Sequence, residues 1–456
     1  MKEMLTVKEA AKQWKITERR VAALCRDGRI PGACKQGRSW RIPSCAEKPS
    51  DSCVKKTTGP RLPLPIGISD YRLASSRYYY IDKTMMIKEF LDERPMVSLF
   101  TRPRRFGKTL NMDMLRTFFE KTAEDTSVYF KDKKIWKCGK NYRDYQGKYP
   151  VIFITFKDVK RDTWEETYTH ISKIVREEFE RHRELLDSPR CSRYEKEYFK
   201  NMLEGKADST DVMTSLQKLS QMLDEHYGIG PIIIIDEYDT PIQQGYMQGF
   251  YDEVILFMRN LFSGGLNNLA VNSILDSRYS EYFGFTPEEV KEIARYYGAQ
   301  EKYEEICAWY DGYRFGSSEI FNPWSVINYF RNHCRPRAFW QSTGNNEIIG
   351  EILADADADI YEHLNELLQG KSILTYIDTG VIYPQIRNNP SSVYSFLLVA
   401  GYLKALKAET AFGGDYMCEV SLPNREIAVV YNKEILQKLE YMIPQATAVS
   451  VQEAPD

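Results

Sequence analysis

The feature that most constrains the fold is an apolar run that leads through a basic loop into an amphipathic stretch. The run is Met96–Phe100 (MVSLF), the loop is Thr101–Thr109 (TRPRRFGKT), and a helical pattern continues to Lys121. Gly-Lys-Thr between a buried strand and a helix is typical of loops whose backbone N–H groups face phosphates. Arg102 stands where that signature has its first glycine. The segment predicts an α/β domain with a phosphate-binding loop.

Six consecutive residues are expected to hold the phosphates of a nucleotide, through backbone N–H groups, the Lys108 ammonium and the Thr109 hydroxyl. They are Arg105, Phe106, Gly107, Lys108, Thr109 and Leu110. Downstream, four isoleucines run directly into Asp236 and Glu237, a pattern typical of a Walker B strand. Thr109 and Asp236 are expected to hold Mg²⁺, and Glu237 to orient and deprotonate the attacking water.

Two further observations define the fold class. Val151–Phe156 (VIFITF) and Pro231–Asp236 are continuous apolar runs, which parallel sheets covered on both faces require. Long amphipathic stretches such as Thr163–Leu185 lie between them. We therefore predict an α/β fold, a P-loop NTPase parallel sheet with helices on both faces. A mostly helical and aromatic region is expected after Tyr246.

The first 58 residues form a basic head, with 14 Lys and Arg against 6 Asp and Glu, on a chain whose net charge is −2. Thr6 and then Thr17 are suited to cap two short helices, and Ile30–Pro43 is typical of a β-hairpin with a basic tip. Such a head suggests duplex DNA as the partner. The expected DNA-binding residues are Thr17, Arg19, Arg20, Arg26, Arg38, Trp40 and Arg41. A basic helical adaptor that binds a protein is the alternative.

The cysteine count and the length of the apolar runs indicate the cellular compartment in which the protein is expected. Nine cysteines, an odd count without a Cys-x-x-Cys pair, argue against a disulfide framework and against a structural zinc site. The first residues are interrupted by charges and do not form a signal peptide, and no apolar run approaches about 20 residues. We expect a cytoplasmic protein that does not contact the membrane.

Longer strings carry a resemblance. The head's order of helix, turn, helix and wing resembles the small winged helix-turn-helix domain of excisionases and MerR-type regulators. Gly67–Thr84 (GISDYRLASSRYYYIDKT), Arg102–Thr109 and Ile232–Ile242 (IIIIDEYDTPI) resemble the bacterial AAA-ATPase-like family, as do Trp309–Gly316 (WYDGYRFG) and Phe339–Ile349 (FWQSTGNNEII). The resemblance covers about residues 62 to 430, and it implies ATP and Mg²⁺ as cofactors. In this family the loop usually carries Arg at the position of Arg102.

The expected organisation follows from these strings. Residues 1–48 form the winged head, 49–61 a linker, 62–275 the AAA-like ATPase domain, and 276–456 a mostly helical C-terminal region. Members of the family are often followed by a truncated PD-(D/E)XK nuclease. The acidic and lysine pair of such a nuclease is missing from this sequence, so no nuclease activity is expected.

A second departure bears on hydrolysis. Family members insert a further strand after the position of Phe262, and in this class of ATPase that strand carries the polar residue that senses the γ-phosphate. Here only Leu269–Leu275 (LAVNSIL) could substitute, with Asn272 as its central polar side chain. We expect ATP binding with weakened hydrolysis. A DNA-binding regulator with a non-hydrolytic or degenerate site, a purely structural adaptor, and assembly into a homo-oligomer remain open.

Overall fold

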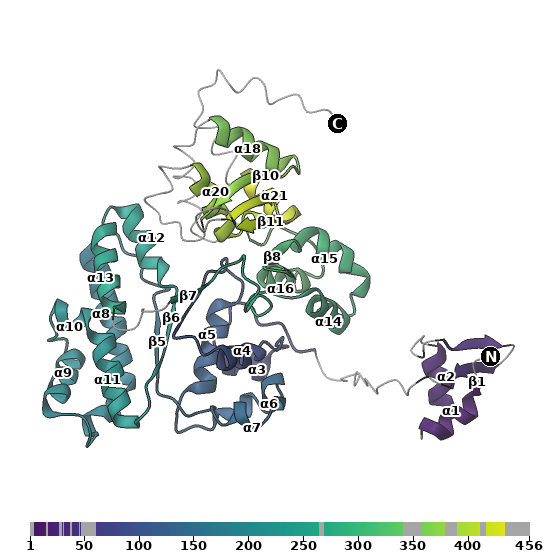
Figure 1. The fold of residues 1–456 in the computed structure, drawn as a ribbon, viewed down its shortest axis with the longest axis horizontal. Coiled ribbons are helices and arrows are strands. Elements are labelled where there is room, and N and C mark those ends of the chain that lie inside the picture. The colour runs from purple at the N-terminus through teal and green to yellow at the C-terminus, as the bar shows by residue number, and fades with distance from the viewer. Residues whose placement is uncertain are drawn as a thin grey trace. The chain divides into compact units, whose positions relative to one another are not determined.

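The chain, seen in a computed structural model, forms two compact units, Met1–Arg61 and Leu62–Asp456, which are treated separately below (Figure 1). No helix in the described part of the chain is long and apolar enough to cross a bilayer. The expected linker lies outside that part except for Arg61. The structure describes residues 4–14, 17–26, 30, 32–36, 39–44, 46, 61–263, 269–340, 358–378, 390–410 and 416–433.

The head contains two helices and a small antiparallel sheet in the order β1-β3-β2. The elements are β1 (Met4–Thr6), α1 (Val7–Trp14), α2 (Glu18–Arg26), β2 (Cys34–Gln36) and β3 (Ser39–Pro43). Thr6 and Glu9 exchange hydrogen bonds, with Thr6 N to Glu9 Oε2 at 2.7 Å and Glu9 N to Thr6 Oγ1 at 3.3 Å. This reciprocal capping is the helix start that the sequence predicts.

The core of the head lies between the two helices and the sheet. Ala10 and Ala11 on α1 are buried with Val21 and Leu24 on α2, so the small alanines do face the second helix. Trp14 is the last residue of α1, and its ring is buried in this core. A head of this size needs such large side chains, because fully burying each contributes about 1.5–3 kcal/mol.

The first part of the second unit alternates strands with helices. In chain order its elements are α3 (Tyr71–Arg77), α4 (Met85–Glu93), β4 (Val97–Phe100), α5 (Lys108–Phe119), η1 (Thr126–Tyr129), α6 (Lys134–Lys137), α7 (Lys140–Arg143), β5 (Val151–Thr155), α8 (Trp164–Arg181), η2 (Arg183–Asp187), α9 (Arg193–Glu204), α10 (Ser209–Met213), α11 (Ser215–Tyr227), β6 (Ile232–Asp236), α12 (Asp239–Gln248) and α13 (Tyr251–Phe262).

The parallel strands form two separate pairs. The strand before the phosphate loop, β4, pairs with β7 (Leu269–Asn272), while β5 pairs with the Walker B strand β6. No described strand joins the two pairs, so the expected single parallel sheet is not observed. The expectation of fully buried strands also fails in part, because β4 is only half-buried and Ile233 and Val271 are each 39% exposed. Strands that lack a neighbour on one edge leave their side chains less covered.

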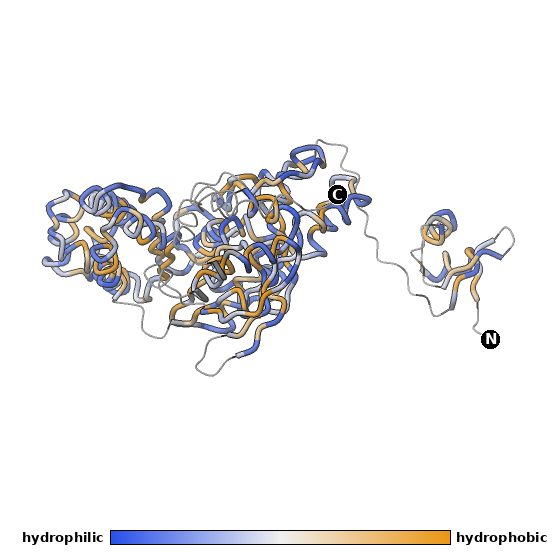
Figure 2. The backbone as a smooth tube through the Cα atoms, turned by 90° about the horizontal axis from the view of Figure 1, so that it is seen from above, coloured by the Kyte–Doolittle hydropathy of each residue, from blue (hydrophilic) through white to orange (hydrophobic). Residues whose placement is uncertain are grey.

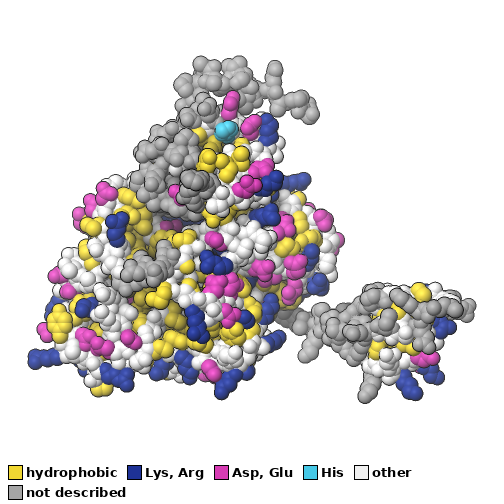
Figure 3. All heavy atoms as spheres, in the orientation of Figure 1, with side chains coloured by type: hydrophobic (Ala, Val, Ile, Leu, Met, Phe, Trp, Pro, Cys, Tyr) yellow, Lys and Arg dark blue, Asp and Glu magenta, His cyan; other side chains and the backbone are white. Residues whose placement is uncertain are grey.

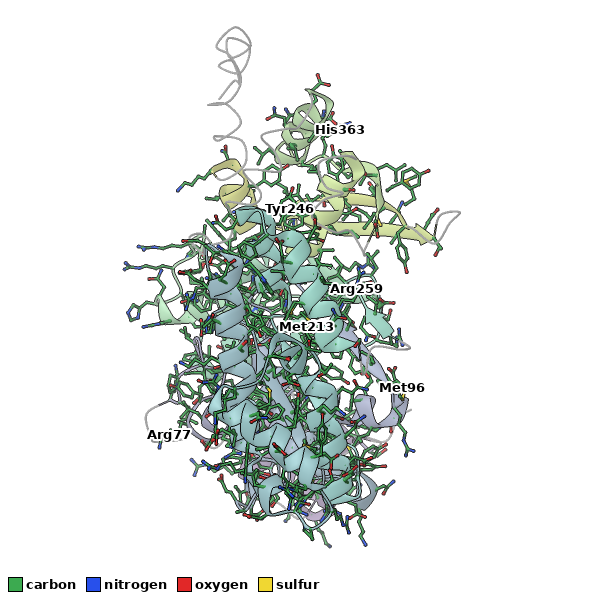
Figure 4. All side chains as sticks on the ribbon, turned by 90° about the vertical axis from the view of Figure 1, so that its left-hand side faces the viewer. Arg77, Met96, Met213, Tyr246, Arg259 and His363 are labelled. Carbon is green, nitrogen blue, oxygen red and sulfur yellow. The ribbon has the colours of Figure 1, made fainter. Side chains whose placement is uncertain are left out.

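Helices cover both faces of the β5–β6 pair, as predicted (Figure 1). Ile152 and Ile154 point into a core shared with α8, α11 and α13. Val151 and Ile234 lie in the core of the opposite face, which includes Met114 and Phe118 of α5. Figure 4 views the helices α8, α11 and α13 from their outer side. Figure 2, in which the backbone is coloured by residue hydropathy, shows hydrophobic residues in the interior of the unit. On this second face, α5 packs against both β5 and β6.

The region after residue 269 holds more β-structure than the sequence pattern predicts. A hairpin, β8–β9, and an antiparallel sheet in the order β10-β12-β11 accompany its helices. Its elements are β7, α14 (Pro287–Tyr297), η3 (Gln300–Lys302), α15 (Tyr303–Tyr310), β8 (Tyr313–Phe315), β9 (Ser318–Ile320), α16 (Pro323–Arg331), α18 (Ala358–Leu368), β10 (Ile373–Ile377), α20 (Pro390–Ala400), β11 (Lys404–Thr410), β12 (Tyr416–Ser421) and α21 (Arg425–Tyr431).

Candidate functional site

The loop between β4 and α5 has the backbone of an anion-binding turn. Gly107 precedes α5 with a φ of 83°, which favours glycine, and no side chain caps the first turn of that helix. Arg105 also has a left-handed backbone, with a φ of 69°. The first N–H groups of α5 are therefore left without a capping side chain, and the helix dipole makes this end suited to a phosphate.

The strand β6 brings its carboxylate to the start of α5. Thr109 donates from Oγ1 to Asp236 Oδ2 at 3.0 Å, and Thr155 at the end of β5 donates to the same oxygen at 3.3 Å. Asp236 is 3% exposed, and this burial raises the pKa of its carboxyl group. A buried carboxylate beside two hydroxyls is an all-oxygen donor set, which fits Mg²⁺. The predicted metal pair, Thr109 and Asp236, is thus brought together.

Thr155 is a member of this site that the sequence analysis missed. Its signal is the register of the two strands, in which Thr155 lies opposite Asp236. Because neighbouring parallel strands end at the same edge of a sheet, a polar residue closing the VIFITF run falls beside the residue that closes the Walker B run. The run itself did not reveal which strand it would pair with.

Lys108 and Glu237 flank this pair. Lys108 donates from Nζ to the backbone carbonyl of Arg102 at 2.7 Å. Glu237 is half-buried and takes a φ of 51°, a conformation that costs a non-glycine residue of order 1–3 kcal/mol and is found at functional sites. Burial and the neighbouring Asp236 and Asp239 raise the pKa of Glu237. A carboxyl group held this way is suited to accept a proton.

The remaining predicted loop residues are anchored by their side chains. Phe106 is fully buried against the rings of Tyr313 and Phe315, at centroid distances of 4.9 and 5.2 Å. Leu110 is half-buried and packs against the main core of the unit. Their side chains therefore fix the loop, and only their backbone groups remain for a ligand.

Arg105 points toward the C-terminal region. Its guanidinium lies 4.2 Å from the ring centroid of Trp324 and donates to the carbonyl of Phe339 at 3.3 Å. Burial lowers the pKa of Arg105 to about 10, which leaves it charged at neutral pH. The expectation that Arg105 holds phosphate is therefore restricted to its backbone.

A buried carboxylate lies next to this contact. Glu426 on α21 is fully buried, and its Oε1 accepts the N–H groups of Phe339 and Trp340 at 2.6 and 2.9 Å. Burial raises the pKa of Glu426 to about 7, although the Arg105 charge acts in the other direction. Sequence analysis missed this residue, because the string around it gives no sign of a partner near the phosphate loop.

In the head, the predicted DNA-binding residues divide into three groups. Thr17, Arg19 and Arg26 are exposed on or before α2. Figure 3 shows Lys and Arg side chains on the face of the head that is in view. Trp40 packs against the head core, and Arg41 donates to Gln36 at 3.2 Å on the facing strand. The side chains of Arg20 and Arg38 lie outside the described residues.

Comparisons with known proteins match the head and the second unit to two different families. Residues 65–276 match the family described as a predicted AAA-ATPase, and residues 4–44 match a helix-turn-helix domain family. An Azotobacter chroococcum mcd 1 protein named "Uncharacterized protein in vnfD 5'region" is 26% identical over 415 residues, covering 85% of this chain and 72% of the relative. The chain carries an AAA-ATPase-like domain behind a helix-turn-helix head, which confirms the resemblance.

The Glu426 carboxyl group predicts a pH dependence. Its pKa in the folded state is about 7, above the ordinary 4.5, so the folded chain keeps a proton that the unfolded chain releases over this interval. The stability that this proton confers is present at acidic pH and is lost as the pH rises toward 7 and beyond. We expect the loss to be roughly 3 kcal/mol at most.

Urea unfolding of the wild type and of Glu426→Gln at pH 5, 6, 7 and 8 measures this difference. The variant should lose part of the wild-type fall in stability, whereas Glu177→Gln, an exposed control on α8, should follow the wild type. Identical pH profiles for wild type and Glu426→Gln would show that Glu426 is not the group that titrates.

Proposed function

We propose that this protein binds Mg-ATP in the loop between β4 and α5, hydrolyses it slowly or not at all, and binds duplex DNA through its head. The hydrogen bond of 3.0 Å between Thr109 and Asp236 is the observation that carries the proposal. It brings the hydroxyl of the loop and the carboxylate of β6, 127 residues apart in the sequence, to one end of a helix that lacks a capping side chain.

The roles follow from the chemistry of each group. The N–H groups of Gly107, Lys108 and Thr109 would hold the phosphates, and the Lys108 ammonium would leave the carbonyl of Arg102 to meet their charge. Thr109 and Asp236 would hold Mg²⁺, which neutralises charge on the β- and γ-phosphates when it is bound. Glu237 would accept the proton of the attacking water.

Weak hydrolysis is proposed because, among the described residues, no further strand joins the two strand pairs and could carry a polar group to the γ-phosphate. Asn272, the candidate in LAVNSIL, is 1% exposed, and its Nδ2 donates back to Ala270 of the same strand at 3.4 Å. The backbone carbonyl of Asn272 accepts from Thr101 N at 3.2 Å, whereas its buried side-chain Oδ1 has no hydrogen-bond partner among the described residues. Losing one such positioning group commonly costs about 2.7–4 kcal/mol of transition-state stabilisation.

DNA binding is supported by the match of residues 4–44 to a helix-turn-helix family and by the exposed arginines of α2. In helix-turn-helix proteins the second helix enters the major groove, and basic side chains contact phosphates. The head has a hydrophobic core of its own, so this activity is proposed to be separable from the nucleotide site.

Lys108→Ala is expected to abolish nucleotide binding without unfolding the chain, because Lys108 is only half-buried and its partner is a backbone carbonyl. Mg-ATP at a hundredfold excess over its Kd should stabilise the wild type by about 2.7 kcal/mol. Thermal melting with and without Mg-ATP measures this effect. Lys173→Ala, on the exposed side of α8, serves as the control and should behave like the wild type. An equal shift in Lys108→Ala would count against the loop.

Glu237→Gln is expected to change ATP turnover little, because the described residues supply no further strand beside the Walker B strand to carry a group that positions the water. Phosphate release should be at or below the detection limit in both wild type and variant, although both bind ATP. A wild-type rate of about 1 s⁻¹ or faster that Glu237→Gln abolishes would contradict the proposal, since it would require an intact catalytic arrangement.

Deletion of residues 1–48 should abolish binding to a mixed-sequence DNA duplex and leave the Mg-ATP melting shift intact. Arg19→Ala and Arg26→Ala should each weaken binding and lower its salt dependence by about one unit of slope per phosphate contact. Fluorescence anisotropy at several salt concentrations measures both, with Arg183→Ala in the second unit as the charge-matched control. Persistent DNA binding after the deletion would refute the role of the head.

A further inference from the structure

We infer that Arg102 is the positioning residue of the phosphate loop. Its buried guanidinium fixes the start of the loop to the turn that follows β7, and its carbonyl group holds the Lys108 ammonium. Arg102 acts through this geometry and not through contact with phosphate. This inference rests on the nucleotide binding proposed above, and it names Arg102 as a residue that sets the affinity of the loop for Mg-ATP.

The guanidinium of Arg102 is buried and donates through both of its terminal nitrogens, while its Nε has no hydrogen-bond partner among the described residues. The side chain is 2% exposed. Its NH1 group donates to the carbonyls of Asn272, at 3.1 Å, and Ser273, and its NH2 group donates to the carbonyl of Arg278 at 3.1 Å. These three acceptors lie in one short segment that runs from the last residue of β7 to Arg278, about 170 residues away in the sequence. Without the guanidinium, the carbonyls of Ser273 and Arg278 would lose this buried donor, whereas the carbonyl of Asn272 would keep Thr101 N.

Aromatic rings and a carboxylate complete the surroundings of this cation. The guanidinium carbon lies 5.6 Å from the ring centroid of Phe283 and 5.1 Å from that of Phe315, within the range of cation–π attraction. Asp276 closes the same turn by accepting from Ser273 N at 2.7 Å and from its hydroxyl at 2.8 Å. Burial lowers the pKa of Arg102 to about 10 while Asp276 opposes the shift, so Arg102 is charged at neutral pH.

The backbone of Arg102 connects this anchor to the ligand side of the loop. The Arg102 carbonyl accepts from Lys108 Nζ at 2.7 Å, and the preceding residue, Thr101, donates its N–H to Asn272 O at 3.2 Å. The turn after β7 therefore fixes the position of the first residues of the loop. The Arg102 carbonyl fixes the position of the Lys108 ammonium. If the guanidinium is lost, the loop keeps its sequence but not its fixed shape.

Lysine cannot replace this arginine. The acceptors are reached by two different nitrogens of one planar fork, whereas an ammonium is a single point on a flexible stem. We expect Arg102→Met to weaken Mg-ATP binding by roughly tenfold or more, as the loss of one charged hydrogen-bond donor implies. Arg102→Lys should recover only part of that affinity.

A matched control separates positioning from general stability. Lys83 is also a buried cation of the second unit, and its Nζ donates to Glu281 O at 2.7 Å and to Glu289 Oε2 at 2.5 Å, both outside the loop. Lys83→Met should lower the melting temperature as a buried pair is lost. It should not change the Kd for Mg-ATP.

Isothermal titration of the full-length chain with Mg-ATP, well below each melting temperature, tests the inference because it reports Kd separately from the fraction of competent protein. The expected result is a raised Kd at unchanged stoichiometry for both Arg102 variants, with Lys83→Met at the wild-type Kd. A wild-type Kd in Arg102→Met overturns the inference, and so does an equal rise in Lys83→Met. So does the failure of both Arg102 variants to fold, since that assigns Arg102 to stability. A wild type that binds no Mg-ATP overturns the proposed function together with this inference.

Discussion

A loop that binds phosphate with its backbone must leave that backbone free, so its side chains have to hold it in place from elsewhere. In this protein they do so through residues far downstream. Arg102 is bonded to the turn after β7, Phe106 is buried against β8, and Arg105 lies against Trp324 and Phe339. The shape of the phosphate loop therefore depends on contacts with the region that follows the Walker B strand.

The division of the parallel strands into two pairs determines what such a site can do. The proposed nucleotide binding uses the loop, α5 and the end of β6, which the hydrogen bond between Thr109 and Asp236 brings together. Hydrolysis also needs a group that orients water at the γ-phosphate. Among the described residues, β7 pairs with β4 and no strand joins this pair to β5 and β6, so no further strand lies beside β6 to carry such a group.

Local motifs allowed the sequence to predict much of this arrangement. Strand, Gly-Lys-Thr and helix succeed one another along the chain, so their geometry follows from neighbouring residues, as does the capping of α1 by Thr6 and Glu9. What could not be predicted depends on pairing across long distances. Thr155 joins the site only through the register of β5 with β6, and Glu426 only through the docking of α21. The antiparallel sheet of β10, β11 and β12 was missed because its short alternating runs lie among longer helical patterns.

We propose that this site has the groups needed to bind phosphate and Mg²⁺ but an incomplete set of groups for hydrolysis. The most direct measurement is to load the full-length protein with Mg-ATP, remove free nucleotide, and identify the bound nucleotide chromatographically over several hours. We expect a stoichiometric complex in which the nucleotide remains ATP. Recovery of ADP within seconds to minutes would contradict it, and recovery of no nucleotide at saturating Mg-ATP would contradict the binding site itself.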